Sequence, residues 1–336
     1  MNPSPFSLTA CLLLLGSLPA PAEDWPQWFG PNRDGVWRET GIVEKFPKGG
    51  PKVLWRTPIQ RGCAGPAVSG DRVYVMDREA DDSREARARA ARTGFKPGNE
   101  RLLCLDATTG RIIWEKSHRC AYTMAYSAGP RVTPTVDGDR VYTFGGEGNL
   151  ICRSTKDGAE KWSHDFKRLF SVETQTWGFA AGPLIHGDLI ICLAAGDGST
   201  AVAFDKLTGK EAWRALSAKQ PGYSPPRIVR HAGRDFLIVW HPESANALDP
   251  KTGKAKWATD LKSRSLFRGS PTGADGKIYV QNHAGTVHVI DAKSGQVLHR
   301  AEMGEAGDDR TRASIAVAHG SLFIRTNSRL YCIGKS

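Results

Sequence analysis

The sequence predicts an all-β fold, a single β-propeller of four-stranded antiparallel blades. Three observations predict it. A turn motif, Asp-x-x-Thr-Gly with a Trp four residues after the Gly, recurs along the chain, and a hairpin signature lies before each copy. The motif tryptophans Trp114, Trp162, Trp213 and Trp257 are separated by 44 to 51 residues. Periods of this length with four strands each are typical of propeller blades.

The turn motif has a structural explanation. It occupies residues 105–114, 204–213 and 248–257, with weaker copies at 154–162 and 290–295. In such a turn the Asp side chain accepts hydrogen bonds from downstream backbone amides, and Gly takes the left-handed conformation. We therefore interpret the repeated aspartates as turn residues and the repeated tryptophans as anchors of blade packing. The aspartates are Asp106, Asp205, Asp249 and Asp291; the tryptophans are Trp55, Trp114, Trp162, Trp213 and Trp257.

A second signature begins each predicted blade. A short strand follows Gly-Pro or Thr-Pro, and a Gly-Asp or Asp-Gly turn leads into the next strand. The copies lie at 65–75, 133–142 and 182–191, with further versions at 270–280 and 315–324. The Gly supplies the positive φ that a tight hairpin requires. The third strand then enters the Asp turn, and the fourth strand carries the Trp.

These signatures predict six blades that close into a ring. The blades span residues 63–117, 127–165, 179–216, 222–260, 267–300 and 312–334. The last copy ends after three strands, whereas 53–56 resembles an isolated fourth strand. We expect segment 52–57 to complete the last blade, because ring closure removes free sheet edges. An open solenoid is the alternative, and these complementary ends disfavour it.

Composition excludes several classes. With 336 residues, 40% hydrophobic and 24% charged, the chain is long enough for a large core and unlike disordered, collagen or coiled-coil sequences. No apolar run reaches the length of a membrane-spanning helix. The net charge is +11, but the charges are spread along the chain instead of clustered. We therefore predict no nucleic-acid partner and no transmembrane segment.

The N-terminus predicts export. Residues 1–22 are uncharged, contain a short apolar run at 8–18, and end in Ala20-Pro21-Ala22. This pattern is typical of a signal peptide cleaved near Ala22, so we expect a periplasmic or secreted protein. Residues 23–51 then form a lead-in segment before the propeller at 52–334. In an oxidising compartment Cys63 and Cys120, which lie in matching loops, are one possible disulfide, although the pairing stays open.

The longer connections, between second and third strands and between blades, fall on one face of the predicted ring. Long loops on a rigid scaffold are where function concentrates. We predict a ligand- or partner-binding face made of aromatic, basic and polar side chains; the alternative is that they plug the axial opening. They are Tyr122, Tyr126, Trp177, Tyr223, Trp240, His241, Glu243, Arg268, His283, Arg310 and Arg312.

A charged insertion at 78–100 separates the second and third strands of the first blade. Its segment 79–92 is rich in Ala, Arg and Glu and is compatible with a short helix on the same face. A solvated loop is the usual explanation of such a run, and an arm that contacts a partner is the other.

The repeats resemble the tryptophan-docking motif of PQQ-like propellers, a superfamily that includes quinoprotein dehydrogenases and the outer-membrane assembly lipoprotein BamB. Segment 24–35, Asp-Trp-Pro-Gln-Trp-Phe-Gly-Pro-Asn-Arg-Asp-Gly, is similar to the start of secreted PQQ-binding-like repeat proteins of planctomycetes. The resemblance covers residues 24–334 and implies a propeller. Such families usually build seven or eight blades, so these counts are the alternatives to six.

The resemblance implies two functions of different classes. One is an exported, non-catalytic scaffold of the cell envelope that binds an envelope protein; the other is a PQQ-dependent oxidoreductase with PQQ and Ca²⁺ on the axis. The sequence lacks the adjacent cysteine pair typical of those enzymes, and no calcium-ligand set matches. It also lacks the common hydrolase, metalloprotease and nucleotide-binding motifs. We therefore predict a monomeric scaffold without catalytic residues, metal or cofactor; an acidic glycan is a further possible partner.

Overall fold

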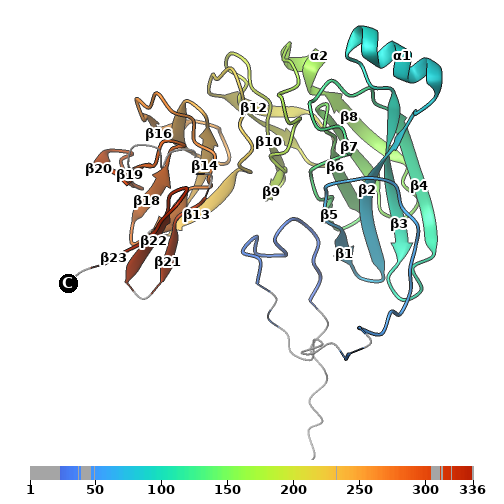
Figure 1. Ribbon diagram of the computed structural model, residues 1–336, viewed down its shortest axis with the longest axis horizontal. Helices are drawn as coiled ribbons and strands as arrows, with labels where there is room; N and C mark the ends of the chain where they lie inside the picture. The colour runs from blue at the N-terminus through green and yellow to red at the C-terminus, as the bar shows by residue number, and fades with distance from the viewer. Residues whose placement is uncertain are drawn as a thin grey trace, which may run out of the picture.

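Six antiparallel sheets stand side by side along an arc (Figure 1). The computed structural model describes residues 23–36, 38, 47–48, 50–231, 233–303, 311, 313–318 and 320–334. Five sheets have four strands and the sixth has three. The all-β class and six blades are as predicted from the sequence. The predicted signal peptide, 1–22, lies outside the described residues.

The sheets follow one another along the chain, each in simple up-and-down order. The first contains β1 (Ala67–Ser69), β2 (Arg72–Ala80), β3 (Gly98–Asp106) and β4 (Ile112–Arg119). The second contains β5 (Thr135–Asp137), β6 (Arg140–Phe144), β7 (Asn149–Ser154) and β8 (Glu160–Asp165). The third contains β9 (Leu184–His186), β10 (Leu189–Leu193), β11 (Ala201–Asp205) and β12 (Glu211–Ala215). The fourth contains β13 (Arg227–His231), β14 (Arg234–His241), β15 (Ser244–Leu248) and β16 (Ala255–Asp260). The fifth contains β17 (Thr272–Ala274), β18 (Lys277–Gln281), β19 (Thr286–Asp291) and β20 (Val297–Glu302), and the sixth contains β21 (Ala316–Ala318), β22 (Ser321–Arg325) and β23 (Leu330–Ile333).

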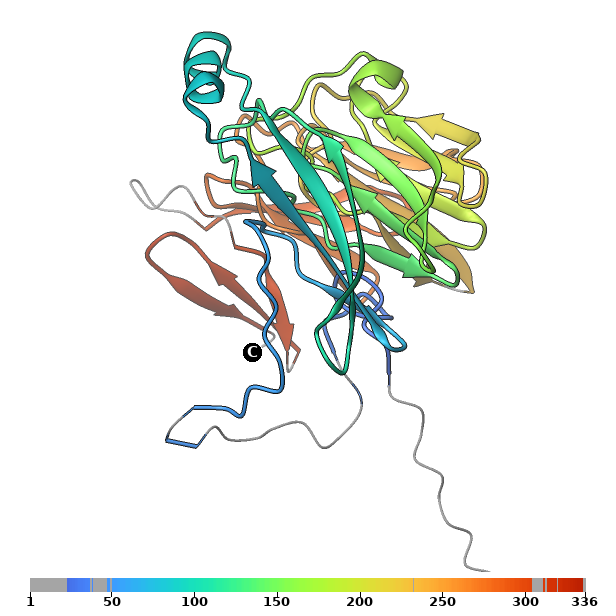
Figure 2. The ribbon, with the colours of Figure 1, turned by 90° about the vertical axis from the view of Figure 1, so that its right-hand side faces the viewer.

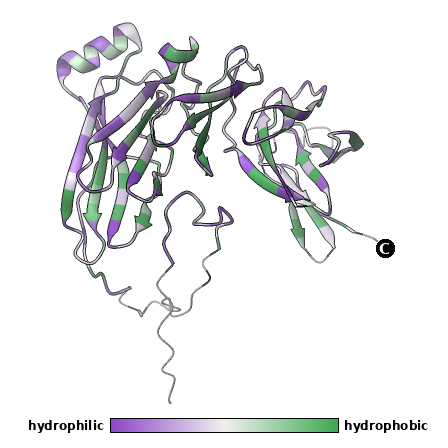
Figure 3. Ribbon diagram, turned by 180° about the vertical axis from the view of Figure 1, so that it is seen from behind, coloured by the Kyte–Doolittle hydropathy of each residue, from purple (hydrophilic) through white to green (hydrophobic). Residues whose placement is uncertain are grey.

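The core lies between neighbouring sheets, because the middle strands are buried on both faces. Between the second and third sheets, Phe144 meets Phe166 and Phe179 with ring centroids 5.0 and 5.5 Å apart. Phe204 of β11 and Tyr142 of β6 close the same cluster. Each fully buried aromatic stabilises the fold by roughly 1.5–3 kcal/mol. Hydrophobic and hydrophilic residues alternate along many strands (Figure 3).

Each motif tryptophan docks on the Asp–Gly turn of the next sheet. Trp213 of β12 shows the contact: its indole Nε1 donates to the Pro250 carbonyl at 3.2 Å. Its ring lies against Gly253, where an added Cβ would come within 2.4 Å of the indole. The corresponding Nε1 to carbonyl distances are 3.0 Å for Trp55–Ala107, 3.1 Å for Trp114–Thr155, 3.1 Å for Trp162–Lys206 and 3.0 Å for Trp257–Ala292. The five tryptophans therefore interlock consecutive blades.

The repeated aspartates hold the turns on which the indoles rest. Asp106 accepts hydrogen bonds from the amide and hydroxyl of Thr109 at 2.7 and 2.8 Å, and Asp205 does the same with Thr208. These bonds favour the ionised carboxylate and lower the pKa of both aspartates. Their role is structural, as the motif indicates.

The predicted ring closure is wrong. Trp55 docks on the first sheet in the same way as the motif tryptophan on the fourth strand of a blade docks on the next sheet. Residues 52–57 nevertheless form no strand. The sixth sheet keeps three strands among the described residues, and Figure 1 places β23 at the opposite end of the arc from segment 52–57. The physical reason is that one docked indole and the Thr57 hydroxyl bond to Gly110 hold this segment without any strand pairing.

The lead-in segment crosses the inner strands of four sheets. Trp25 exchanges two 2.9 Å backbone hydrogen bonds with Val68 of β1, and the Pro26 carbonyl accepts from the Val136 amide of β5. Arg33 then donates to the Pro183 carbonyl beside β9, while Arg227 of β13 donates to the Arg33 carbonyl. The segment lies below β5 and β9 in Figure 1, at the end of the sheets away from the helices.

Two short helices mark the opposite face (Figures 1 and 2). Helix α1 (Arg84–Thr93) lies within the charged insertion, where Ser83 caps its first turn and Gly94 ends it in the left-handed conformation. Strands β2 and β3 extend into the insertion from both sides, pairing as far as Ala80 with Gly98. Helix α2 (Phe166–Phe170) follows β8. No helix in the described part of the chain is long and apolar enough to cross a membrane.

We predict that the Arg33→Ala substitution destabilises the fold. The Arg33 side chain is buried and donates to the Pro183 carbonyl and Gln27, and burial lowers its pKa to about 10. Removing it leaves buried acceptors unpaired, which costs about 1–3 kcal/mol in chemical denaturation. The matched control is Arg38→Ala, because the Arg38–Asp34 pair is exposed and its loss should leave the denaturation midpoint almost unchanged. Equal effects of the two substitutions would contradict the lead-in's role.

Candidate functional site

An aromatic–arginine patch lies on the face that carries the long loops. We define it as Tyr126, Arg131, Trp177 and Tyr223, from the β4–β5, α2–β9 and β12–β13 connections. Tyr126 is 60% exposed, Trp177 49% and Tyr223 41%. Single exposed aromatic side chains are ordinary on a surface, but several that lie next to one another are typical of interaction sites. Three of the four residues are among those predicted from the sequence; Arg131 was missed.

Arg131 links the patch. Its Nε donates to the Trp177 carbonyl at 2.9 Å, and its two terminal nitrogens donate to the Gly129 and Tyr126 carbonyls. The guanidinium carbon lies 6.0 Å from the Tyr126 ring centre, within cation–π range. On the other side, the Trp177 amide faces the Tyr223 hydroxyl at 3.4 Å. Residues from three separate connections are thereby held in one arrangement.

The loops beneath the patch are fixed by buried contacts. The Ala125 amide donates to the Thr176 carbonyl at 2.8 Å, and Phe179 donates to the Gly146 carbonyl at 2.9 Å. Gly178 has φ 77° and lies so close to the Met124 sulfur that an added Cβ would come within 2.6 Å of it. The patch therefore rests on an ordered support.

The patch has a positive character. Burial raises the pKa of Tyr223, and the Trp177 amide together with the positive charges of Arg268 and Arg131 opposes that rise. Neither arginine forms an ion pair with a carboxylate in the described ranges. The surface can accept acidic or carbonyl groups together with apolar side chains.

Three predicted face residues are buried instead of exposed. Tyr122 is fully buried, and its hydroxyl donates to Glu100 at 2.5 Å. Trp240 packs edge-on against Phe267, with ring centroids 4.9 Å apart, and His241 pairs with the Ser244 hydroxyl at 2.8 Å. The prediction was wrong for these residues because β14 extends through His241 and the loop at 120–124 folds into the interior.

The other predicted face residues lie apart from the patch or outside the description. Glu243 is exposed and accepts from the Lys219 amide, whereas His283 is half-buried against the Thr311 carbonyl. Arg268 is exposed, and its positive charge opposes the burial-induced rise in the pKa of Tyr223. Arg310 and Arg312 lie outside the described residues.

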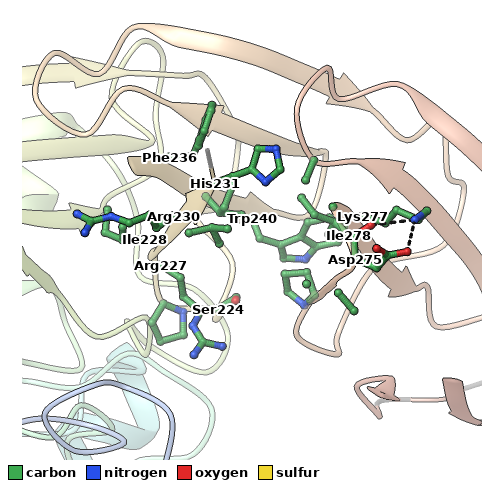
Figure 4. A pocket seen from close by; sticks show the side chains of 18 residues that line it. Ser224, Arg227, Ile228, Arg230, His231, Phe236, Trp240, Asp275, Lys277 and Ile278 are labelled. Atoms are coloured by element: carbon green, nitrogen blue, oxygen red, sulfur yellow. Dashed lines mark hydrogen bonds and ion pairs between the residues drawn. The ribbon is translucent and has the colours of Figure 1, made fainter. Parts of the chain in front are cut away.

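A pocket lies elsewhere, between the fourth and fifth sheets. Its volume is about 430 Å³, and its wall is mainly apolar. Figure 4 shows Trp240 between the fourth sheet and the paired side chains of Lys277 and Asp275. The cations at its rim are already engaged, since Arg230 pairs with Asp235 and Arg227 bonds the lead-in. It is a gap between blades and is separate from the patch.

The possible disulfide is not formed. Cys63 is free and exposed, and Cys120 is free and buried. Cys120 packs with Tyr122 and Met124 and directs its thiol toward the Asn149 side chain at 3.7 Å. Burial of the Cys120 loop turns its thiol inward, so the matching loop positions do not bring the two sulfurs together.

Two buried carboxylates lie under the patch, and sequence interpretation missed both. Glu147 accepts from the Thr123 amide at 2.6 Å and pairs with Lys167 at 2.7 Å. Glu100 accepts from Tyr122 and from the Gly146 amide at 2.8 Å, and desolvation raises its pKa. The available signal was a Gly-Gly-Glu-Gly run at 145–148.

Beside Glu100 lie His118 and Cys120. Their potential ligand atoms and those of Glu100 fall within 4.8 Å of one another, and burial lowers the pKa of His118 to about 4. This group is the one cluster of acidic, His and Cys side chains found in the described part that can surround a metal. With a single carboxylate it does not fit Ca²⁺, which takes six to eight oxygen ligands. The calcium implied by the quinoprotein alternative is therefore not matched there.

The fold and its tryptophan-docked turns define a β-propeller of PQQ-like repeats. A family model described as "Outer membrane protein assembly factor BamB" matches residues 39–119 and 98–333. The chain belongs to this BamB-like PQQ-repeat family.

Curated relatives are distant. The chain is 24% identical over 160 residues to outer membrane protein assembly factor BamB of Shewanella oneidensis, covering 47% of this chain and 36% of the relative. It is 26% identical over 219 residues to the serine/threonine-protein kinase AfsK of Streptomyces coelicolor, covering 65% and 21%. The chain thus spans well under half the length of these relatives.

Solved structures agree on the fold. BamB from Moraxella catarrhalis superposes with a TM-score of 0.51 at 17% identity, covering 84% of this chain and 75% of that one. Quinohemoprotein alcohol dehydrogenase from Comamonas testosteroni superposes with a TM-score of 0.57 at 17% identity, covering 85% and 50%. Because one neighbour is named as an assembly factor and the other as an enzyme, these similarities establish the architecture alone.

Proposed function

We propose that this protein is a non-catalytic binding scaffold of the cell envelope that holds a segment of a partner protein on the aromatic–arginine patch. The observation that carries the proposal is the convergence of Tyr126, Trp177 and Tyr223 around Arg131 on one exposed surface. Tyr, Trp and Arg are the residue types that dominate binding energy at protein interfaces.

The patch is suited to binding because its geometry exists before a partner arrives. The Trp177 and Tyr126 carbonyls are already engaged by Arg131, and the supporting loops are joined by backbone hydrogen bonds. Preorganised side chains lose less conformational entropy on association. A partner segment therefore gains apolar contact with the rings at a small ordering cost.

Charge and family membership point to the kind of partner. Two arginines beside Tyr223 favour acidic side chains or exposed carbonyl groups in the partner. The family model and two of the similar proteins are named for outer-membrane protein assembly. By analogy we propose that the partner is an envelope protein and that the protein is periplasmic or secreted. Binding of an acidic glycan, which the net charge suggested, stays a prediction.

We predict that a photo-crosslinking amino acid at position 177 captures an envelope protein in the source cell. Trp177 is about half exposed at the centre of the patch, so a bound segment must approach it. In the same cells, Tyr223→Ala should reduce the yield of the adduct about 30-fold, which corresponds to the roughly 2 kcal/mol of a hot-spot residue. The adduct is identified by mass spectrometry.

Position 95 provides the matched control. Phe95 is also 49% exposed, but it follows helix α1 and lies outside the patch. A crosslinker there should give no adduct with the same protein, and Phe95→Ala should leave the adduct at position 177 unchanged. Equal adducts from both positions, or an adduct unaffected by Tyr223→Ala, would refute the patch as the binding surface.

We also predict that the purified protein does not bind PQQ with Ca²⁺. The described acidic, His and Cys side chains provide no oxygen-rich cluster suited to Ca²⁺, as shown above. Titration with PQQ and Ca²⁺ should therefore change neither the PQQ absorption spectrum nor the melting temperature. Saturable binding accompanied by oxidation of an alcohol or sugar would instead establish the oxidoreductase.

A further inference from the structure

We propose that Glu100, His118 and Cys120 form a zinc site beneath the patch. The potential ligand atoms of the three side chains lie within 4.8 Å of one another. Carboxylate oxygen, imidazole nitrogen and thiolate sulfur are the three donor types that zinc uses in proteins. The site is independent of the proposed partner binding, so each can fail without the other.

Strand register brings the three residues together. Glu100 of β3 lies directly opposite His118 at the end of β4. Cys120 follows two residues after His118, so both side chains project from the same side of the extended chain. The Cys120 amide continues the pairing by donating to the Gly98 carbonyl at 2.8 Å.

The Glu100 carboxylate is held by one oxygen and leaves the other available. Its Oε1 accepts from the Tyr122 hydroxyl at 2.5 Å and from the Gly146 amide at 2.8 Å. Its Oε2 has no hydrogen-bond partner, although the Glu100 side chain is fully buried. Outer donors that orient a carboxylate in this way are typical of metal sites.

His118 faces that free oxygen. Its Nε2 lies 3.5 Å from Glu100 Oε2 and likewise has no hydrogen-bond partner. Two buried polar atoms without partners are costly unless something bridges them. A cation between them, with the Cys120 sulfur as third ligand, satisfies all three groups at once.

The dimensions and the donor set favour zinc. Tetrahedral zinc lies 2.0–2.3 Å from such ligands, so donor atoms about 3–4 Å apart surround it, and small rotations bring the present atoms into that range. Three protein ligands leave a fourth position for water, next to the Asn149 oxygen that lies 3.7 Å from the Cys120 sulfur. The His118 side chain is 23% exposed, which gives an ion a route from solvent.

The test measures metal binding by the full chain itself. We expect one Zn²⁺ per chain in competition with a chromogenic chelator. Co²⁺ in its place should give the absorption of four-coordinate cobalt and a sulfur-to-cobalt charge-transfer band, which reports the thiolate directly. Binding weaker than about 10 μM, or cobalt spectra without the thiolate band, would overturn the site.

Matched variants assign the ligands. Cys120→Ser and His118→Gln should each weaken zinc binding by at least about 100-fold. Tyr122→Phe removes only the donor to Glu100 Oε1 and should weaken it by about 10–100-fold. Cys63→Ser and His164→Gln are the controls, because Cys63 is exposed and His164, in β8 of the second sheet, bonds the Gly209 carbonyl of the third sheet's turn. The assignment would be overturned if Cys120→Ser, His118→Gln and Tyr122→Phe left zinc affinity unchanged, or if either control lost it. If a variant fails to fold, the cobalt thiolate band of the unaltered protein decides the outcome.

Discussion

The contact between a tryptophan and the glycine turn of the following sheet is the constraint on which this structure depends. The indole of Trp213 covers Gly253 so closely that no side chain fits there, and its Nε1 bonds a turn carbonyl. The same contact recurs between each of the first four sheets and the next, and once more where Trp55 reaches the first sheet. Each of the first five sheets is thereby placed relative to its sequential neighbour among them by one large side chain.

The functional surface follows from this placement. Because the turns that receive the tryptophans lie at one end of the sheets, the longer connections gather at the other end with helices α1 and α2 (Figure 1). There Trp177 and Tyr223, 46 residues apart in the chain, come within hydrogen-bonding reach. The lead-in segment covers the inner strands at the end away from these helices, where Arg33 is buried. The opposite face, which carries helices α1 and α2, is therefore formed by the long loops.

Repetition made the fold predictable from the sequence. Trp, Asp and Gly occur at fixed spacing because the same local turn and the same docking contact are built again in successive blades. Ring closure was not predictable in this way, since it depends on whether residues 52–57 pair with β23, a long-range contact that no local motif encodes.

The site was only partly predictable, for a related reason. The loop motif that contains Tyr126 also contains Tyr122, yet one is exposed and the other fully buried, because the loop folds back over Glu100. The Glu100–His118 pairing follows a register shift at Cys104 and Leu105, where β4 carries one extra residue, Ile113. A one-residue bulge of this kind changes which side chains face each other, and although it recurs in the next four sheets, only the first sheet carries Glu and His at the paired positions.

A double-mutant cycle on Trp213 and Gly253 tests the docking contact most directly. In the otherwise unaltered protein, Gly253→Ala should destabilise the fold through both the clash with the indole and backbone strain at φ 69°. In the Trp213→Ala background the indole is absent, so only the strain should remain. We expect a coupling free energy of about 1–3 kcal/mol from chemical denaturation. Gly276 has a similar φ of 67° but open space around it, so Gly276→Ala should be additive with Trp213→Ala. Additivity of Gly253→Ala with Trp213→Ala would contradict the account.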